Sequence, residues 1–285
     1  MPGESPRNLL SIDLEDWFCV SNFDAMFDRS VWDSCELRVV GSTQRLLGLF
    51  ERRGVKATFF VLGWIAERVP ELIRSIAAAG HEIACHGYHH QRLHQLDPAG
   101  FADDLGKALA ILRELSPRPV EGYRAPSFSL TSRTLWALPI LREQGIRWDS
   151  SVFPFGGHPE YGIADAPIEP YWILEELLEL PMTVVEVAGR RVPCTGGGYF
   201  RLYPYSLSAA LIRRCNAEGR PAIFYAHPWE FDPEQPRMPL SPVKRFRHYN
   251  NLDKTLARLE RLLGEFAWGP IGPWAESRRE VARAA

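Results

Sequence analysis

The chain has 285 residues, of which 46% are hydrophobic and 24% are charged, and its formal net charge is −2. This composition is typical of a folded globular protein, and the absence of a broad basic field argues against a nucleic-acid partner. The apolar runs are too short to span a bilayer and the first residues lack the pattern of a signal peptide, so we expect a cytoplasmic protein with no membrane span.

Helical and extended patterns alternate along most of the chain. A short apolar strand is predicted over 9–12, a helix over 43–53, and over 55–62 a nearly continuous apolar run that is typical of a parallel strand buried on both faces. Further helices are predicted over 70–80, 97–115, 131–144, 206–218 and 251–266, and further strands over 81–85, 120–124, 146–149 and 221–226. This alternation predicts βα units and a mostly parallel sheet in one α/β domain.

Three segments lack such a pattern. Residues 153–168 are rich in Gly and Pro and are predicted to form a long loop, and the tail from Glu276 is expected to be frayed. The glycine-rich run Thr195–Arg201 matches neither a dinucleotide nor a phosphate-binding motif. We interpret it either as a flexible turn or as a loop that contacts substrate.

Polar side chains follow the predicted strands, at the edge where functional residues gather in parallel α/β proteins. In chain order they are Asp13, Glu15 and Asp16, then His86 and His90, then Arg124, Asp149 and His227. Two histidines and one carboxylate form a three-ligand metal site that leaves a position open for water. A further carboxylate can act as a base, an arginine can keep that base ionised, and the last histidine can act as an acid.

Each of these residues also has a purely structural interpretation. The three clustered carboxylates fit a solvated acidic turn or a helix N-terminus, although such a cluster is costly without a compensating cation. Arg124 fits a structural ion pair, and His227 fits a buried, hydrogen-bonded histidine.

The motifs together resemble those of NodB-type polysaccharide deacetylases, also called carbohydrate esterase family 4. The similar segments are Ser11–Asp16, His86–His90, Tyr123–Ser127, Asp149–Ser151 and Tyr225–Trp229. Segments His227–Arg237 and Arg247–Asn250 resemble the subgroup linked to bacterial exopolysaccharide loci of the PEP-CTERM type. The resemblance implies a distorted (β/α) barrel of about seven parallel strands. It would be a single domain over 1–285, with catalytic motifs in 9–230 and a family-specific segment over 231–275 in a C-terminal helical extension.

The resemblance also implies a divalent metal, usually zinc, and a role for each polar residue. His86 and His90 would be ligands, Asp13 the base, Arg124 its partner and His227 the acid. The family places two adjacent aspartates after the first strand, whereas Asp13 is followed here by Leu14. The carboxylate ligand is therefore either Glu15 or Asp16. Asp149 either orients the acid histidine, as the resemblance implies, or caps the turn that follows it.

We therefore expect a hydrolase that removes N-acetyl groups from an amino sugar in a polysaccharide or its precursor, in association with exopolysaccharide assembly proteins. The residues expected to bind the sugar are Tyr88, Pro126, Gly197, Tyr199 and Trp229, although aromatic side chains more often belong to a core. One alternative is an amidohydrolase of small C–N substrates such as ureides on the same scaffold. Another is a non-catalytic carbohydrate-binding protein.

Overall fold

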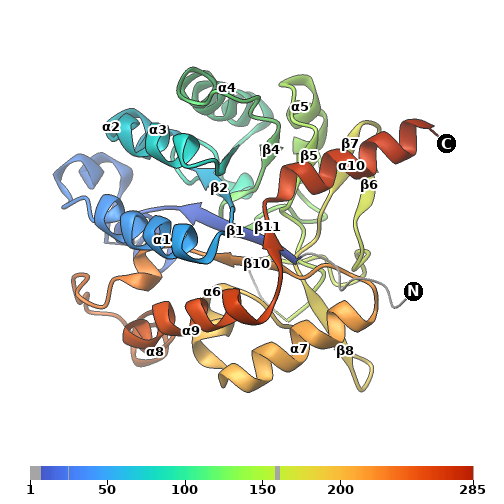
Figure 1. Ribbon diagram of the computed structural model, residues 1–285. Helices are drawn as coiled ribbons and strands as arrows, with labels where there is room; N and C mark the ends of the chain where they lie inside the picture. The colour runs from blue at the N-terminus through green and yellow to red at the C-terminus, as the bar shows by residue number, and fades with distance from the viewer. Residues whose placement is uncertain (1–7, 25, 158–160, 285) are drawn as a thin grey trace.

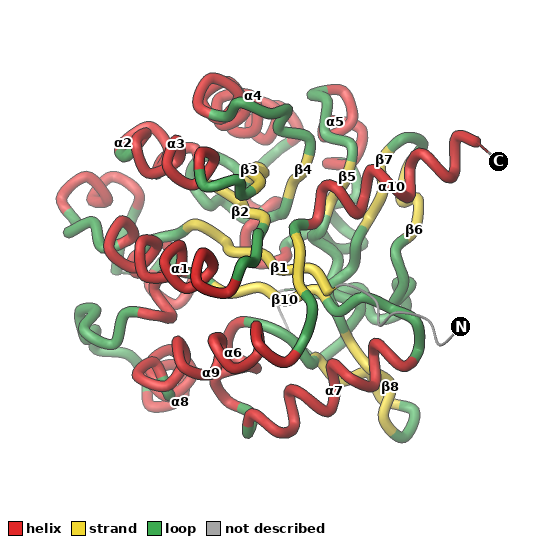
Figure 2. The backbone as a smooth tube through the Cα atoms, viewed as in Figure 1, coloured by secondary structure: helices red, strands yellow, loops and turns green. Residues whose placement is uncertain are grey.

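The computed structural model describes residues 8–24, 26–157 and 161–284. Its strands form a curled sheet at the centre of the molecule, and the helices lie around it (Figures 1 and 2). The strand order is β10-β1-β2-β3-β4-β5-β7-β6, with β11 paired to β1. The strands of this sheet are β1 (Asn8–Leu14), β2 (Thr58–Val61), β3 (Glu82–Cys85), β4 (Gly122–Tyr123), β5 (Trp148–Asp149), β6 (Tyr171–Leu174), β7 (Leu177–Glu179), β10 (Ile223–Ala226) and β11 (Trp268–Gly269).

The path from β10 to β7 contains seven strands, and every neighbouring pair in it is parallel. Only β6 is antiparallel, on the edge beside β7, and β8 (Val184–Val187) and β9 (Arg190–Pro193) form a separate hairpin. This architecture confirms the predicted distorted (β/α) barrel in a single domain. The strands β6 to β9 were not predicted, because they are short and only partly apolar.

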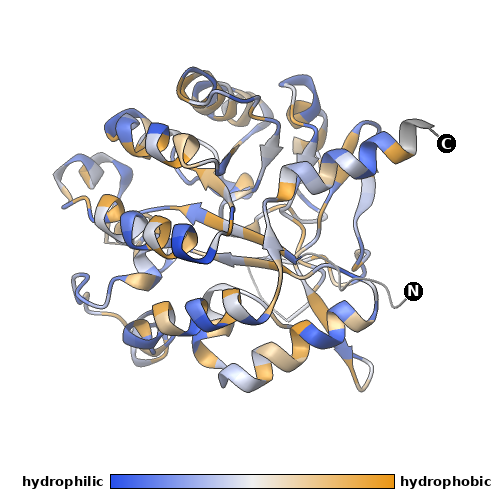
Figure 3. Ribbon diagram, in the orientation of Figure 1, coloured by the Kyte–Doolittle hydropathy of each residue, from blue (hydrophilic) through white to orange (hydrophobic). Residues whose placement is uncertain are grey.

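Ten helices surround the sheet in the described part of the chain. They are α1 (Val39–Arg53), α2 (Gly63–Arg68), α3 (Pro70–Ala78), α4 (Pro98–Leu115), α5 (Ala137–Glu143), α6 (Gly197–Leu202), α7 (Tyr205–Ala217), α8 (Pro242–Tyr249), α9 (Leu252–Glu265) and α10 (Ile271–Ala284). Among the helices that the structure describes, none is long and apolar enough to cross a membrane. In Figure 3 the central strands are mostly hydrophobic, whereas the outer helices carry both hydrophobic and hydrophilic residues.

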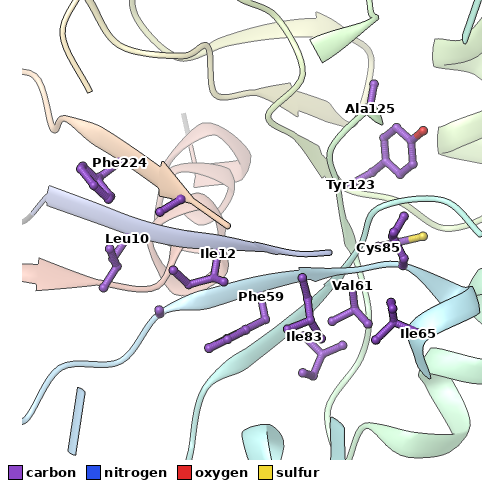
Figure 4. Packing of buried hydrophobic residues seen from close by; sticks show 14 of the residues in the cluster. Leu10, Ile12, Phe59, Val61, Ile65, Ile83, Cys85, Tyr123, Ala125 and Phe224 are labelled. Carbon is purple, nitrogen blue, oxygen red and sulfur yellow. The ribbon is translucent and has the colours of Figure 1, made fainter. Parts of the chain in front are cut away.

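Alternation of side chains along β1 explains how the strand supports a site. Leu10 and Ile12 belong to the large hydrophobic cluster shared with the outer helices, where Figure 4 shows them beside Phe59 of β2. Leu9 belongs instead to a second cluster. Because neighbouring side chains point to opposite faces of a sheet, Asp13 shares the face of Leu9 and is turned into the barrel.

Two predictions about irregular segments were wrong. Thr195–Arg201 is not a loop throughout, because α6 begins at Gly197. The tail is not frayed, because α10 runs to Ala284. The start of α10 is held at the barrel: the backbone N–H of Ile271 donates to Thr58 Oγ1 at 2.7 Å, and the N–H of Gly272 donates to Glu82 Oε2 at 2.8 Å.

Candidate metal centre and active site

Glu15, His86 and His90 form a buried cluster at the carboxyl ends of β1 and β3. Each offers one ligand atom, and these atoms lie within 4.8 Å of one another. Glu15 Oε1 is 3.0 Å from Nε2 of His86 and 3.0 Å from Nε2 of His90. Ligands about 2.0–2.2 Å from a tetrahedral zinc ion are themselves roughly 3.3 Å apart, so these separations suit one small cation.

The hydrogen bonds of His86 fix its ring so that Nε2 faces Glu15. His86 Nδ1 lies 2.8 Å from the backbone carbonyl oxygen of Arg124. A carbonyl oxygen only accepts, so Nδ1 carries a proton and Nε2 is the nitrogen that faces the Glu15 carboxylate. A backbone carbonyl that accepts from the other ring nitrogen commonly orients a metal-binding histidine.

Local backbone geometry brings His90 back to His86. His90 has a φ of +54°, a left-handed conformation that is uncommon for a residue other than glycine. Arg29 holds this turn by donating to the carbonyl oxygens of His89, at 2.7 Å, and of His90, at 3.3 Å. The two imidazole rings, four residues apart, are consequently 5.4 Å from centre to centre.

Of the two carboxylates left open by the sequence, only Glu15 lies in the cluster. Burial alone would raise the pKa of Glu15, but the neighbouring histidines outweigh it and hold that pKa well below its usual range. Asp16 is turned away and caps backbone N–H groups, those of Trp17 at 2.8 Å, Arg38 at 2.7 Å and Val39 at 2.9 Å. The structure therefore corrects Asp16 as a candidate ligand, because its lone pairs are occupied by the chain.

Asp13 is buried inside the barrel and paired with Arg124. Arg124 Nη1 donates to Asp13 Oδ1 at 2.6 Å and to Ser11 Oγ at 2.8 Å. The rest of the guanidinium is held by Ser150, through its carbonyl oxygen and its hydroxyl, each at 3.0 Å. The guanidinium also lies 4.0 Å from the ring centre of Phe60. This arrangement pairs a buried carboxylate with a buried guanidinium and fixes the direction of both.

His227 faces Asp13 and Glu15 from the end of β10. Its Nε2 is 3.8 Å from Asp13 Oδ2 and 3.9 Å from Glu15 Oε1, and Nδ1 is 2.8 Å from Glu230 Oε1. Burial alone would lower the pKa of His227, but the charges of Glu15, Glu230 and Asp13 and the bond to Glu230 raise it to about 9. Glu230 is itself paired with Arg201 Nε at 2.5 Å. His227 is thus held as a proton donor aimed at the cluster.

Asp149 does not orient the acid histidine, which corrects that expectation. It accepts a hydrogen bond from Ser151 Oγ at 2.5 Å, and Ser151 in turn accepts from the N–H of Ala125 at 2.7 Å. Asp149 also pairs in register with Glu179 of β7, and burial raises the pKa of both carboxyls. Asp149 therefore shapes the turn after Arg124, while Glu230 holds His227.

An open pocket of about 250 Å³ leads to these groups. Its lining includes Asp13, Glu15, His90 and His227 together with the aromatic residues Phe128, Tyr161, Tyr225 and Trp229. Trp229 is only 8% exposed, because it stacks between His227, 5.3 Å away, and His248, 4.4 Å away. A carbonyl compound that enters this pocket reaches the Asp13 carboxylate, the His227 imidazole and the three candidate metal ligands together.

The other residues expected to bind the sugar lie elsewhere. Tyr88 is buried, and its hydroxyl donates to Glu67 at 2.6 Å, outside the pocket lining. Pro126 is buried behind Ala125 and Ser127, which do line the pocket.

The glycine-rich segment divides in a similar way. Gly197 has a φ of +49°, and a Cβ there would lie 2.8 Å from the Tyr225 hydroxyl, so it serves close packing while Gly198 lines the pocket. Tyr199 lines a second hollow beside the first.

Residues 23–147 match the family model of polysaccharide deacetylases, and residues 150–276 match the model of a domain of unknown function. A peptidoglycan deacetylase of Helicobacter pylori is 30% identical over 117 residues, which are 41% of this chain and 39% of that protein. A peptidoglycan deacetylase-like protein of Gibberella zeae is 34% identical over 110 residues, which are 38% of this chain and 32% of that protein.

The matched segment thus spans well under half the length of these curated relatives.

Similarity to solved structures extends further along the chain. A crystal structure from Mycobacterium smegmatis, described as a polysaccharide deacetylase, superposes with a TM-score of 0.61 at 21% identity. The superposition covers 98% of this chain and 93% of that one, and it shows the same fold. Together these matches support the resemblance to NodB-type polysaccharide deacetylases.

Proposed function

We propose that the chain is a NodB-type, metal-dependent deacetylase that removes N-acetyl groups from amino sugars in a polysaccharide or its precursor. One observation carries the proposal: Glu15 with two histidines, Asp13 with Arg124, and His227 with Glu230 converge at one pocket. A site for binding alone needs no base and acid matched across a pocket. The match of residues 23–147 to the polysaccharide deacetylase model supports the same reaction class.

Glu15, His86 and His90 would hold the divalent ion, for which we propose zinc. When bound, such an ion lowers the pKa of a water to about 7 and polarises a carbonyl oxygen. Asp13 would accept the proton of the attacking water, because its carboxylate lines the pocket and Arg124 holds one of its oxygens at 2.6 Å. His227 would then protonate the departing amine through Nε2, while Glu230 holds Nδ1. The products are acetate and a free amino sugar.

The exopolysaccharide subgroup is a finer part of the same proposal. The C-terminal half matches a family model separate from that of the deacetylase segment, and segments His227–Arg237 and Arg247–Asn250 within it carry the resemblance to the exopolysaccharide subgroup. We propose that the substrate is an acetylated exopolysaccharide or its precursor and that the chain works with the proteins that assemble it.

Acetate release tests the reaction. The purified chain, loaded with zinc, is incubated with N-acetylglucosamine oligomers, and acetate and free amine are measured. We expect equal amounts of both, and Asp13→Asn should lower the rate by about 10²–10⁴-fold through loss of the base. Asp253→Asn, an exposed carboxylate on α9, is the matched control and should leave the rate unchanged. Equal rates in wild type and Asp13→Asn, or no acetate from any acetylated sugar, would contradict the proposal.

A further inference from the structure

A second hollow, here called the α6–α8 subsite, adjoins the catalytic pocket. Its volume is about 240 Å³. The residues that line both hollows are Tyr161, Gly198, Arg201, Tyr225 and Arg247. The two hollows therefore adjoin, and the second lies where the next part of a substrate would be if its acetylated sugar occupied the first.

Aromatic side chains shape the α6–α8 subsite. Tyr161 and Tyr199 contribute hydroxyls that lie 3.0 Å apart, and Phe246 of α8 lines the hollow with 53% of its surface exposed. Such rings offer an apolar face and, in tyrosine, a polar edge, which suits a sugar ring. The space is smaller than the roughly 300–1,000 Å³ of sites for drug-sized ligands, so it suits a single sugar unit.

The charged side chains that line the α6–α8 subsite, among the residues that the structure describes, are arginines. Among the described residues no carboxylate lines it, whereas two arginines do. Arg201 is neutralised by Glu230 and also donates to the carbonyl oxygen of His248 at 2.8 Å. Arg247 is exposed, and its side chain forms no ion pair or hydrogen bond with the part of the chain that the structure describes. One guanidinium at the junction of the two hollows is thus available to a ligand.

Position distinguishes Arg247 from an ordinary surface arginine. Lys244 and Arg245 lie on the same helix and are also exposed, but neither lines either hollow. Lys244 and Arg245 therefore serve as controls for general electrostatic attraction to this helix. A guanidinium binds carboxylates and phosphates through two parallel hydrogen bonds, which an ammonium cannot do.

We propose that the α6–α8 subsite binds a negatively charged group next to the acetylated sugar, and that Arg247 pairs with that group. The substrate class is then an acidic glycan or a phosphorylated amino sugar rather than a neutral polymer. This inference rests on the proposed deacetylase function for the meaning of the first hollow, but binding in the second hollow is measured without turnover.

Equilibrium binding tests the proposal in the zinc-loaded full chain carrying Asp13→Asn, which prevents consumption of the ligand. The probes are a hyaluronan tetrasaccharide, in which a carboxylate flanks each acetylated sugar, and its uncharged methyl ester. A second pair, N-acetylglucosamine 1-phosphate and N-acetylglucosamine, presents a phosphate instead. We expect at least one charged probe to bind about threefold to fivefold more tightly than its neutral partner, the upper part of the range for one ion pair at an exposed site.

Variants on α8 assign that preference. Arg247→Ala should abolish it without weakening binding of the neutral probe, Arg247→Lys should restore part of it, and Arg245→Ala should leave it intact. A preference confined to one charged probe identifies carboxylate or phosphate as the partner and supports the proposal. Equal losses in Arg247→Ala and Arg245→Ala, or no preference for either charged probe, would overturn it. If the wild-type chain released no acetate, that result would instead count against the proposed function alone.

Discussion

Replacing Glu230 with glutamine tests how the acid histidine is held. The variant Glu230→Gln keeps an acceptor near His227 Nδ1 but removes the charge that now lies 2.8 Å away. A hydrogen bond to a charged group is worth about 1.5–3 kcal/mol and a neutral one about 1 kcal/mol. The difference of about 1–2 kcal/mol lowers the pKa of His227 by about one unit, at roughly 1.4 kcal/mol per unit. Because His227 must be protonated to act, the alkaline limb of the pH–rate profile should move down by about one pH unit.

The same change also affects stability, so it needs a control. Arg201 loses its buried partner, which costs about 3 kcal/mol of unfolding free energy. Asp232→Asn removes a similarly buried carboxylate, paired with Arg38 at 2.6 Å, without any contact to His227. It should lower stability but leave the pH–rate profile in place. An unmoved alkaline limb in Glu230→Gln, or an equal shift in Asp232→Asn, would refute the reasoning.

Three further predictions concern the fold around the site. Burial raises the pKa of Glu82 to about 7, so its ionisation opposes folding as pH rises from about 4.5 to 7. Glu82→Gln should therefore raise the free energy of unfolding by up to about 3 kcal/mol at pH 8 and by under about 1 kcal/mol at pH 5, measured by urea unfolding. Gly196→Ala should lower the free energy of unfolding by about 3 kcal/mol, because φ is +75° and the added Cβ would lie 2.3 Å from Tyr225. Gly189→Ala, at a similar φ but with open space around it, should lower it by about 1 kcal/mol, and equal losses in the two variants would contradict this. Tyr88→Phe should lower the free energy of unfolding by about 1 kcal/mol, because it removes the hydrogen bond to Glu67, and it should leave KM unchanged. A raised KM would place the Tyr88 hydroxyl at the substrate.

The sequence predicted a mostly parallel α/β sheet because its buried strands are short, apolar and separated by helices, and the resemblance to NodB-type deacetylases implied that this sheet closes into a barrel. The same logic located the polar residues, since the carboxyl ends of parallel strands share one edge. Asp13, His86, Arg124 and His227 occur in the sequence directly at these ends, and the structure places them around one pocket.

Side-chain direction within a turn was harder to predict. Glu15 and Asp16 are adjacent, and only the backbone after β1 decides which one faces the histidines. Asp149 ends a strand like the other site residues, yet its carboxylate bonds within the barrel wall. Glu230 was missed as the partner of His227, although its position three residues later was a usable signal for an ion pair.

Some site residues depend on contacts between segments that are distant in sequence. Arg201 reaches Glu230 across 29 residues, and Arg247 comes to the catalytic pocket only because α8 packs beside α6. Neither residue carries a local pattern that marks it as functional. The aromatic residues divide between the pocket and the core for the same reason.

Metal stoichiometry tests the central claim most directly. The chain should bind one divalent ion, measured by metal analysis after dialysis, and Glu15→Gln should lose most of that ion because one of three ligands is removed. Asp16→Asn should retain a full equivalent, since Asp16 caps backbone groups instead. Full metal binding by Glu15→Gln, together with metal loss in Asp16→Asn, would contradict the account.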